Sequence, residues 1–193
     1  MSDLMKLTGQ ALALTGPPGI GKSARLAQAE DDARGRGWHV HTVTGARAEL
    51  GLPYAGIERL FRGVLPLDAI LAERDPYRVA LAVLDRLSPD TLLIADDAHW
   101  LDEPSWQVLA YVGRRLAGQP LTLLVSLRDG VETARRLAGS GLPEREIRPL
   151  ATKDPSYRDV VAELPSPARR TDHRPAAAGL PLSAGGQPRL RRG

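Results

Sequence analysis

Residues 11–23 read Ala-Leu-Ala-Leu-Thr-Gly-Pro-Pro-Gly-Ile-Gly-Lys-Ser, an apolar run that passes straight into a glycine-rich loop. A short apolar run of this kind favours a buried β-strand. After Lys22, small and apolar residues are interspersed with charged ones as far as Gly35 and Gly37, which is typical of a helix that ends at glycine. The sequence therefore predicts a strand, a glycine loop and a helix in that order.

The loop has the spacing Gly-x-x-x-x-Gly-Lys-Ser, met by Gly16, Gly21, Lys22 and Ser23, which is the P-loop pattern of nucleotide phosphate sites. Glycines let the backbone curl so that N–H groups and the positive end of the helix face an anion. We expect Lys22 to neutralise the β and γ phosphates and Ser23 to offer a hydroxyl oxygen to Mg²⁺. In a chain of this composition roughly 0.003 chance matches are expected, so an ordinary glycine turn is the weaker interpretation.

The expected ligand is ATP with Mg²⁺. No obvious Asn/Thr-Lys-x-Asp motif, the pattern that reads guanine, is present, which favours ATP over GTP. The predicted nucleotide-binding residues are Gly16, Pro17, Pro18, Gly19, Ile20, Gly21, Lys22 and Ser23.

Two carboxylates end the next strongly apolar run. Residues 91–95 form a continuous apolar stretch that enters Asp96 and Asp97, as expected of a strand covered on both faces of a parallel sheet. Alone, this pattern is more often a strand end followed by a solvated turn. Downstream of a P-loop, we expect Asp96 to bind Mg²⁺ through its water shell and Asp97 to polarise the water that attacks the γ phosphate.

A third apolar strand, 121–126, is followed by an arginine. Ligands of open α/β sheets bind outside the carboxyl ends of the strands, so Ser126 and Arg128 are placed to sense the γ phosphate. The alternative is a surface arginine paired with Asp129 or Glu103, which would contribute little. The predicted catalytic set is accordingly Lys22, Asp97 and Arg128, and the predicted metal ligands are Ser23 and Asp96.

Strands alternate with helices along most of the chain. Helical spacing extends over 54–65, 76–87, 103–116 and 131–138, and further strands are predicted at 40–44 and 146–150. This alternation predicts an α/β fold with a doubly wound parallel sheet. His39 and His41 share a strand face but lack further zinc ligands, and structural roles are expected for His99 and Trp100.

The alternation of predicted strands and helices ends at about residue 152. We predict a domain at 1–152, short at its N-terminus, and a poorly ordered Pro/Gly/Arg-rich tail at 153–193. Residues 168–193 hold six arginines and one aspartate, a net +5, so the remaining residues balance to −2 within the total of +3. The basic character therefore belongs to the tail, and the body has no basic face that would argue for DNA.

Composition restricts the setting. The chain has no cysteine, which excludes disulfides and thiolate chemistry and fits a reducing compartment. Its apolar runs are far shorter than the roughly 20 residues that a membrane span needs. The N-terminus does not resemble a signal peptide, so a cytoplasmic location is expected.

The stretches 15–23, 92–102 and 123–129, with the Gly-Leu-Pro-Tyr-Ala-Gly-Ile-Glu-Arg-Leu-Phe segment 51–61, together resemble one family. They look like the ATPase domain of large LuxR-family transcriptional regulators, within the signal-transduction (STAND, AAA-type) P-loop ATPases. The resemblance covers about residues 10–150. It implies a P-loop NTPase three-layer sandwich with a mainly parallel five-stranded sheet of order 5-1-4-3-2.

The resemblance also implies an ATP-dependent switch with slow hydrolysis, in which Arg128 is a sensor. Other protein domains, or self-association, are the expected partners. Members carry a Gly-Arg segment before the first strand, for which residues 1–10 are too short, and continue into winged-helix, repeat and helix-turn-helix regions that 151–193 does not show. The chain therefore has no visible DNA-binding element, and two alternatives stay open: a free-standing P-loop ATPase or kinase, and a truncated, catalytically inactive chain.

Overall fold

The computed structural model describes residues 9–147. Its strands and helices are, in chain order, β1 (Gln10–Thr15), α1 (Lys22–Gly35), β2 (His39–Thr44), the 3₁₀ turn η1 (Arg47–Glu49), α2 (Ala55–Phe61), α3 (Leu67–Leu71), α4 (Pro76–Leu84), β3 (Thr91–Asp96), the 3₁₀ turn η2 (Ala98–Trp100), α5 (Glu103–Gly113), β4 (Leu121–Ser126), α6 (Val131–Ser140) and β5 (Glu144–Glu146). No helix within this part of the chain is long and apolar enough to cross a bilayer.

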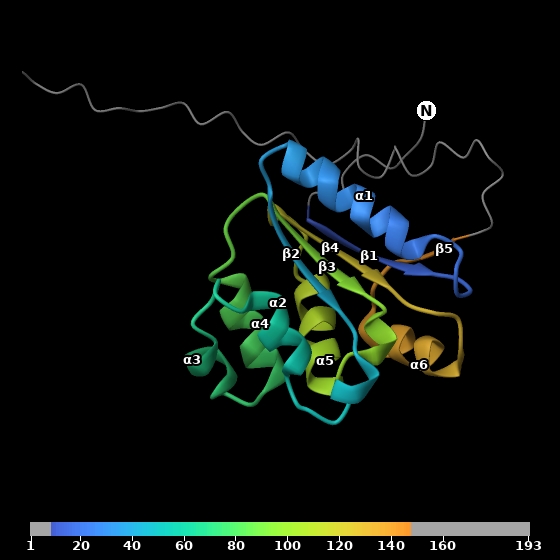
Figure 1. Cartoon of the computed structure of the whole chain (residues 1–193). Coiled ribbons are helices and arrows are strands. Elements are labelled where there is room, and N and C mark those ends of the chain that lie inside the picture. Colours follow the sequence, from blue (N-terminus) through green and yellow to red (C-terminus); the bar gives the residue numbers. More distant parts are fainter. Residues whose placement is uncertain (1–8, 148–193) are drawn as a thin grey trace, which may run out of the picture.

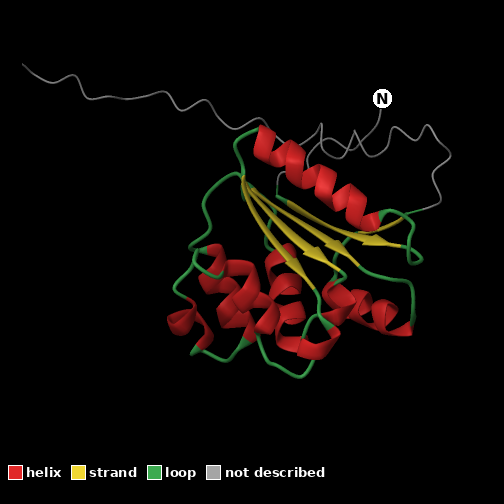
Figure 2. Cartoon of the chain, viewed as in Figure 1, coloured by secondary structure: helices red, strands yellow, loops and turns green. Residues whose placement is uncertain are grey.

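The five strands form one parallel sheet. Its order is β2-β3-β4-β1-β5, and every neighbouring pair is parallel. Read from the other edge, this is the predicted order 5-1-4-3-2, so the predicted fold class is confirmed. Helix α1 covers one face and the remaining helices lie on the other (Figures 1 and 2), which makes the three-layer sandwich.

The apolar strands supply both layers of the core because successive side chains of a strand point to opposite faces. On β1, Ala11 and Ala13 belong to the larger cluster beneath the sheet, whereas Leu12 and Leu14 belong to the cluster under α1. The same alternation runs through β3. A continuous apolar run is therefore required, since neither face of a central strand meets water.

The helices depart from the predicted bounds at several of their ends, and one short helix was not predicted. Helix α2 ends at Phe61 instead of residue 65, since Arg62 is extended (ψ 126°) and Gly63 has φ +74°. The short helix α3 was not predicted, because it follows Pro66 and has only five residues. Helices α4 and α5 end about three residues early, and α6 extends to Ser140, where Gly141 at φ +67° stops it.

The last strand was predicted too late in the chain. Strand β5 covers Glu144–Glu146, beside the end of β1, whereas the prediction was 146–150. The sequence Glu-Arg-Glu carries no apolar signal, and this edge strand is instead held by backbone pairing and by the Thr15 hydroxyl, which donates to Glu144 at 2.8 Å. Residues 148–150 and the predicted tail lie outside the described residues.

Candidate functional site

The P-loop joins β1 to α1 at the carboxyl edge of the sheet. Gly19 and Gly21 adopt φ of +78° and +98°, a backbone conformation that side chains with a Cβ disfavour. Gly21 also precedes the first turn of α1, which has no side-chain cap and no acidic residue. In the part of the chain that the structure describes, the N–H groups of that turn therefore lack a side-chain cap and are available to an anion.

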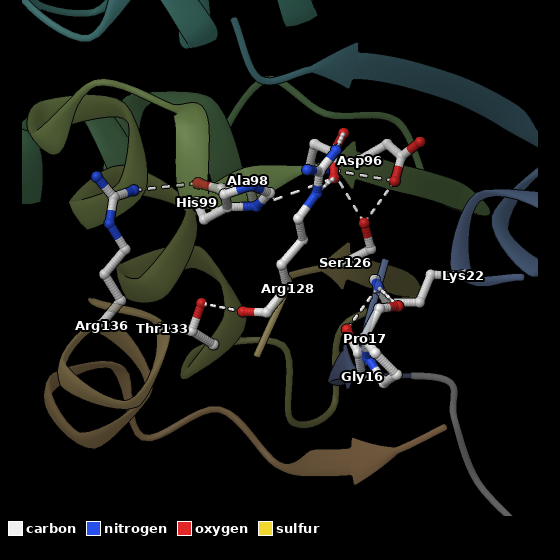
Figure 3. Close-up of polar contacts among 11 residues, drawn as sticks. Gly16, Pro17, Lys22, Asp96, Ala98, His99, Ser126, Arg128, Thr133 and Arg136 are labelled. Atoms are coloured by element: carbon white, nitrogen blue, oxygen red, sulfur yellow. Dashed lines mark hydrogen bonds and ion pairs between the residues drawn. The ribbon is translucent and has the colours of Figure 1, made fainter. Parts of the chain in front are cut away.

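Lys22 bends back onto the loop. Its Nζ donates to the carbonyls of Gly16 at 2.7 Å and Pro17 at 2.9 Å (Figure 3), and the residue is only 5% exposed. Burial lowers the pKa of Lys22, although the carboxylates of Asp129 and Asp97 oppose that shift. The ammonium group is held by weak, neutral acceptors, which a phosphate would outcompete.

Two carboxylates and a hydroxyl meet where β3 and β4 end. The Ser126 hydroxyl donates to Asp96 Oδ1 (Figure 3). The Asp97 backbone N–H donates to the same Asp96 oxygen at 3.0 Å and to Ser126 Oγ at 2.9 Å. Asp97 adopts a left-handed conformation, φ +47° and ψ +42°, which turns the chain so that the two adjacent carboxylates have different surroundings.

Arg128 follows the end of β4, and its guanidinium reaches the Asp97 carboxylate at the end of β3. Its Nε lies 3.4 Å from Asp97 Oδ1 and its Nη2 lies 3.4 Å from Asp97 Oδ2. The arginine side chain is 44% exposed, so this long pair contributes little to stability. The predicted alternative partners were Asp129 and Glu103, and the observed partner is the proposed water-activating carboxylate.

Seven of the eleven predicted site residues line one small cavity of about 210 Å³, and Gly16, Pro17, Ile20 and Asp96 lie outside its lining. It is lined by Pro18, Gly19, Gly21, Lys22, Ser23, Ala24, Asp97 and Arg128. Asp96 stands behind this lining, bonded to Ser126 and to the Asp97 backbone, while Ile20 packs against the core under α1. A larger groove of about 580 Å³ lies between α5 and α6, but it contains none of the predicted residues, so the chemistry favours the smaller cavity.

Comparison with known proteins agrees with this arrangement. The family of AAA ATPase domains matches residues 4–125, more than half of the chain. The chain belongs to this family.

The structural relatives of this AAA ATPase domain are distant. Drosophila ORC bound to AT-rich DNA and Cdc6 is 16% identical, with a TM-score of 0.46 over 75% of this chain and 50% of that chain. A Thermotoga maritima RuvB variant is also 16% identical, with a TM-score of 0.35 over 71% of this chain and 37% of that chain. The AAA ATPase domain thus spans half or less of the length of these relatives. No curated protein matches it.

Sequence reasoning missed Asp102, a buried carboxylate that follows η2 and directly precedes α5. It is 2% exposed and accepts backbone hydrogen bonds from Tyr54 at 2.7 Å, Gly56 at 3.0 Å and Ser105 at 3.0 Å. It therefore caps α5 and also fixes the start of α2 in this AAA ATPase domain. Asp followed by Glu-Pro is a helix-start signal, but the contact with residues 54 and 56 has no local signal.

Sequence reasoning also missed Arg136 of α6. It is 8% exposed and its guanidinium donates to the Ala98 carbonyl (Figure 3) and to the Leu101 carbonyl. His99 lies between these two carbonyls in the chain, with its ring against Trp100 at a centroid distance of 4.8 Å. Burial lowers the pKa of His99. The AAA ATPase domain thus holds the turn after its acidic pair by contacts from a distant helix.

Proposed function

We propose that this AAA ATPase domain binds ATP with Mg²⁺ at the P-loop and acts as a nucleotide-dependent switch. The left-handed glycines and the uncapped start of α1 fit a chain of phosphates. Ser23 is exposed, and Asp96 keeps one carboxylate oxygen without a hydrogen bond in the described part of the chain. These hard oxygen donors suit Mg²⁺, which would neutralise phosphate charge and retain several of its waters.

The pairing of Arg128 with Asp97 across the cavity carries this proposal. Arg128 is half-exposed and its two contacts are long, so a γ phosphate offers it stronger, charge-assisted hydrogen bonds. Transfer of Arg128 to the phosphate releases the Asp97 carboxylate, which then polarises the attacking water. The Thr133 hydroxyl of α6 donates to the Arg128 carbonyl. A movement of Arg128 from Asp97 to the phosphate would therefore be transmitted to α6.

The test is the affinity ratio for ATP and ADP, measured by titration with Mg²⁺ in wild type and in Arg128→Ala. We expect ATP to bind more tightly than ADP in wild type, and this preference to fall about tenfold in Arg128→Ala with ADP affinity unchanged, which corresponds to one charged hydrogen-bonding contact. Arg135→Ala is the control, because Arg135 is an exposed arginine of α6. An unchanged preference in Arg128→Ala would remove Arg128 from the sensing role.

The wider setting proposed is a nucleotide-binding part of a LuxR-type transcriptional regulator acting in the cytoplasm, where ATP is supplied. Residues 51–61 and 92–102 support this setting by their resemblance to that group. Partner domains or self-association would then respond to the bound nucleotide. Sedimentation with ATP and with ADP tests this, since a switch predicts a nucleotide-dependent change in mass, whereas steady turnover by a monomer favours the free-standing ATPase.

A further inference from the structure

Arg136 ties α6 to the turn that follows Asp97. Its Nη1 donates to the Ala98 carbonyl at 3.0 Å and its Nη2 to the Leu101 carbonyl at 2.9 Å. These carbonyls lie at the first residue of η2 and directly after its end. One planar guanidinium therefore holds both ends of a three-residue turn, through two nitrogens fixed in a rigid fork.

The surroundings make Arg136 a fixed point of α6. Its side chain is 7% exposed, its Nε donates to Glu132 at 3.3 Å, and its guanidinium lies 5.8 Å from the ring centre of Trp106 on α5. A buried arginine that is paired on every side loses more when displaced than an exposed one. Helix α6 is thus held against both η2 and α5.

The same helix holds the other half of the Asp97–Arg128 pair. Three residues before Arg136, the Thr133 hydroxyl donates to the Arg128 carbonyl (Figure 3). Asp97 sits in a left-handed conformation that costs a non-glycine residue free energy unless its neighbours hold it. Helix α6 therefore contacts both sides of the pair. Arg136 bonds to the turn that follows Asp97, and Thr133 bonds to the backbone of Arg128.

We propose that Arg136 is a positioning residue that sets where the Asp97 carboxylate meets Arg128 and, through this, how strongly the site prefers ATP to ADP. This inference rests on the proposed function of the P-loop site. Arg136 does not line the P-loop cavity, so its loss leaves the α and β phosphate contacts unchanged. The γ-phosphate edge alone is affected, because that is where Asp97 and Arg128 lie.

The test compares Arg136→Gln with Arg135→Gln, a matched control whose side chain is 84% exposed. In nucleotide-free protein, backbone amides of residues 97–101 should exchange with deuterium about tenfold faster in Arg136→Gln, since the turn opens more often without its two donors. Amides of β1 and α1 should be unchanged. With Mg²⁺, the ATP-over-ADP affinity ratio should fall at least about threefold at constant ADP affinity.

Each outcome decides the proposal. Equal exchange at 97–101 in the two variants overturns it, and so does faster exchange spread evenly over the domain, which would make Arg136 a general stabiliser. Local opening with an unchanged ATP-over-ADP ratio also overturns it. If wild type binds neither nucleotide, the proposed function fails, and the exchange comparison still decides whether Arg136 positions the turn. Should Arg136→Gln not fold, Arg136→Lys, which keeps the charge and loses the fork, takes its place.

Discussion

Replacement of Asp102 should strongly destabilise the fold. The carboxylate is 2% exposed and accepts three backbone N–H groups, from Tyr54, Gly56 and Ser105. Both carboxylate oxygens accept hydrogen bonds: Oδ1 accepts from the N–H groups of Tyr54 and Ser105, and Oδ2 accepts from that of Gly56. Asp102→Ala removes every acceptor at once, whereas Asp102→Asn keeps one oxygen and turns an amide NH₂ toward a neighbouring donor.

The magnitude follows from these contacts. A hydrogen bond to a charged group contributes about 1.5–3 kcal/mol, and a buried donor left unpaired costs about 1–3 kcal/mol. Because the three contacts share one side chain they do not add fully, so Asp102→Ala should lower the free energy of unfolding by roughly 4–6 kcal/mol. Asp102→Asn should lower it by about 2 kcal/mol. Domain stabilities are typically about 5–15 kcal/mol, so the alanine variant will be marginal.

Urea unfolding monitored by tryptophan fluorescence measures both values. Asp75→Ala is the matched control, since Asp75 caps α4 by accepting from Tyr77 at 2.8 Å and Arg78 at 3.1 Å at an exposed position. Loss of that cap should cost about 1 kcal/mol. If Asp102→Ala costs no more than Asp75→Ala, the buried carboxylate does not hold α2 to α5, and the reasoning from burial is wrong.

Three further changes test other parts of the account. Gly45→Ala should cost about 2 kcal/mol in urea unfolding, since a Cβ there would overlap the Asp97 carbonyl, while Gly51→Ala, which meets open space, should cost under about 0.5 kcal/mol. Burial keeps the pKa of His99 below the ordinary 6.5, so protonation favours the unfolded chain and the free energy of unfolding should fall as pH drops below 6.5. His99→Phe should flatten that decline. The same pH profile in wild type and His99→Phe would contradict this prediction. Ser126→Ala removes a buried hydroxyl bridge and should cost about 1–2 kcal/mol, a value that an unchanged urea midpoint would refute.

Local sequence patterns predict those elements of the fold that are buried along their whole length or that depend on residues adjacent in the sequence. Strands β3 and β4 are covered on both faces, so most of their side chains are apolar and the strands are easy to recognise. The P-loop depends on residues adjacent in sequence, and its glycines have the predicted backbone freedom. The order of the strands came from the family resemblance, since apolar periodicity alone does not set it.

The remaining features depend on contacts between distant residues. Asp102 bonds to residues 46 and 48 positions away, and Arg136 bonds to carbonyls 35 and 38 positions away. A buried charge has the same local sequence as an exposed one, so only the folded chain separates Arg136 from its exposed neighbour Arg135. Strand β5 was misplaced for a related reason, since its pairing uses backbone groups and its side chains carry no apolar pattern.

The most direct test of the account is binding of a fluorescent ATP analogue with Mg²⁺ to the purified chain and to Lys22→Ala, with unlabelled GTP as competitor. Among residues 9–147, the Lys22 ammonium donates to the Gly16 and Pro17 carbonyls, neutral acceptors that it can exchange for phosphate. We expect saturable binding that Lys22→Ala abolishes and that GTP does not displace. Absence of binding by a wild-type chain shown to be folded would contradict it, and would favour a catalytically inactive chain.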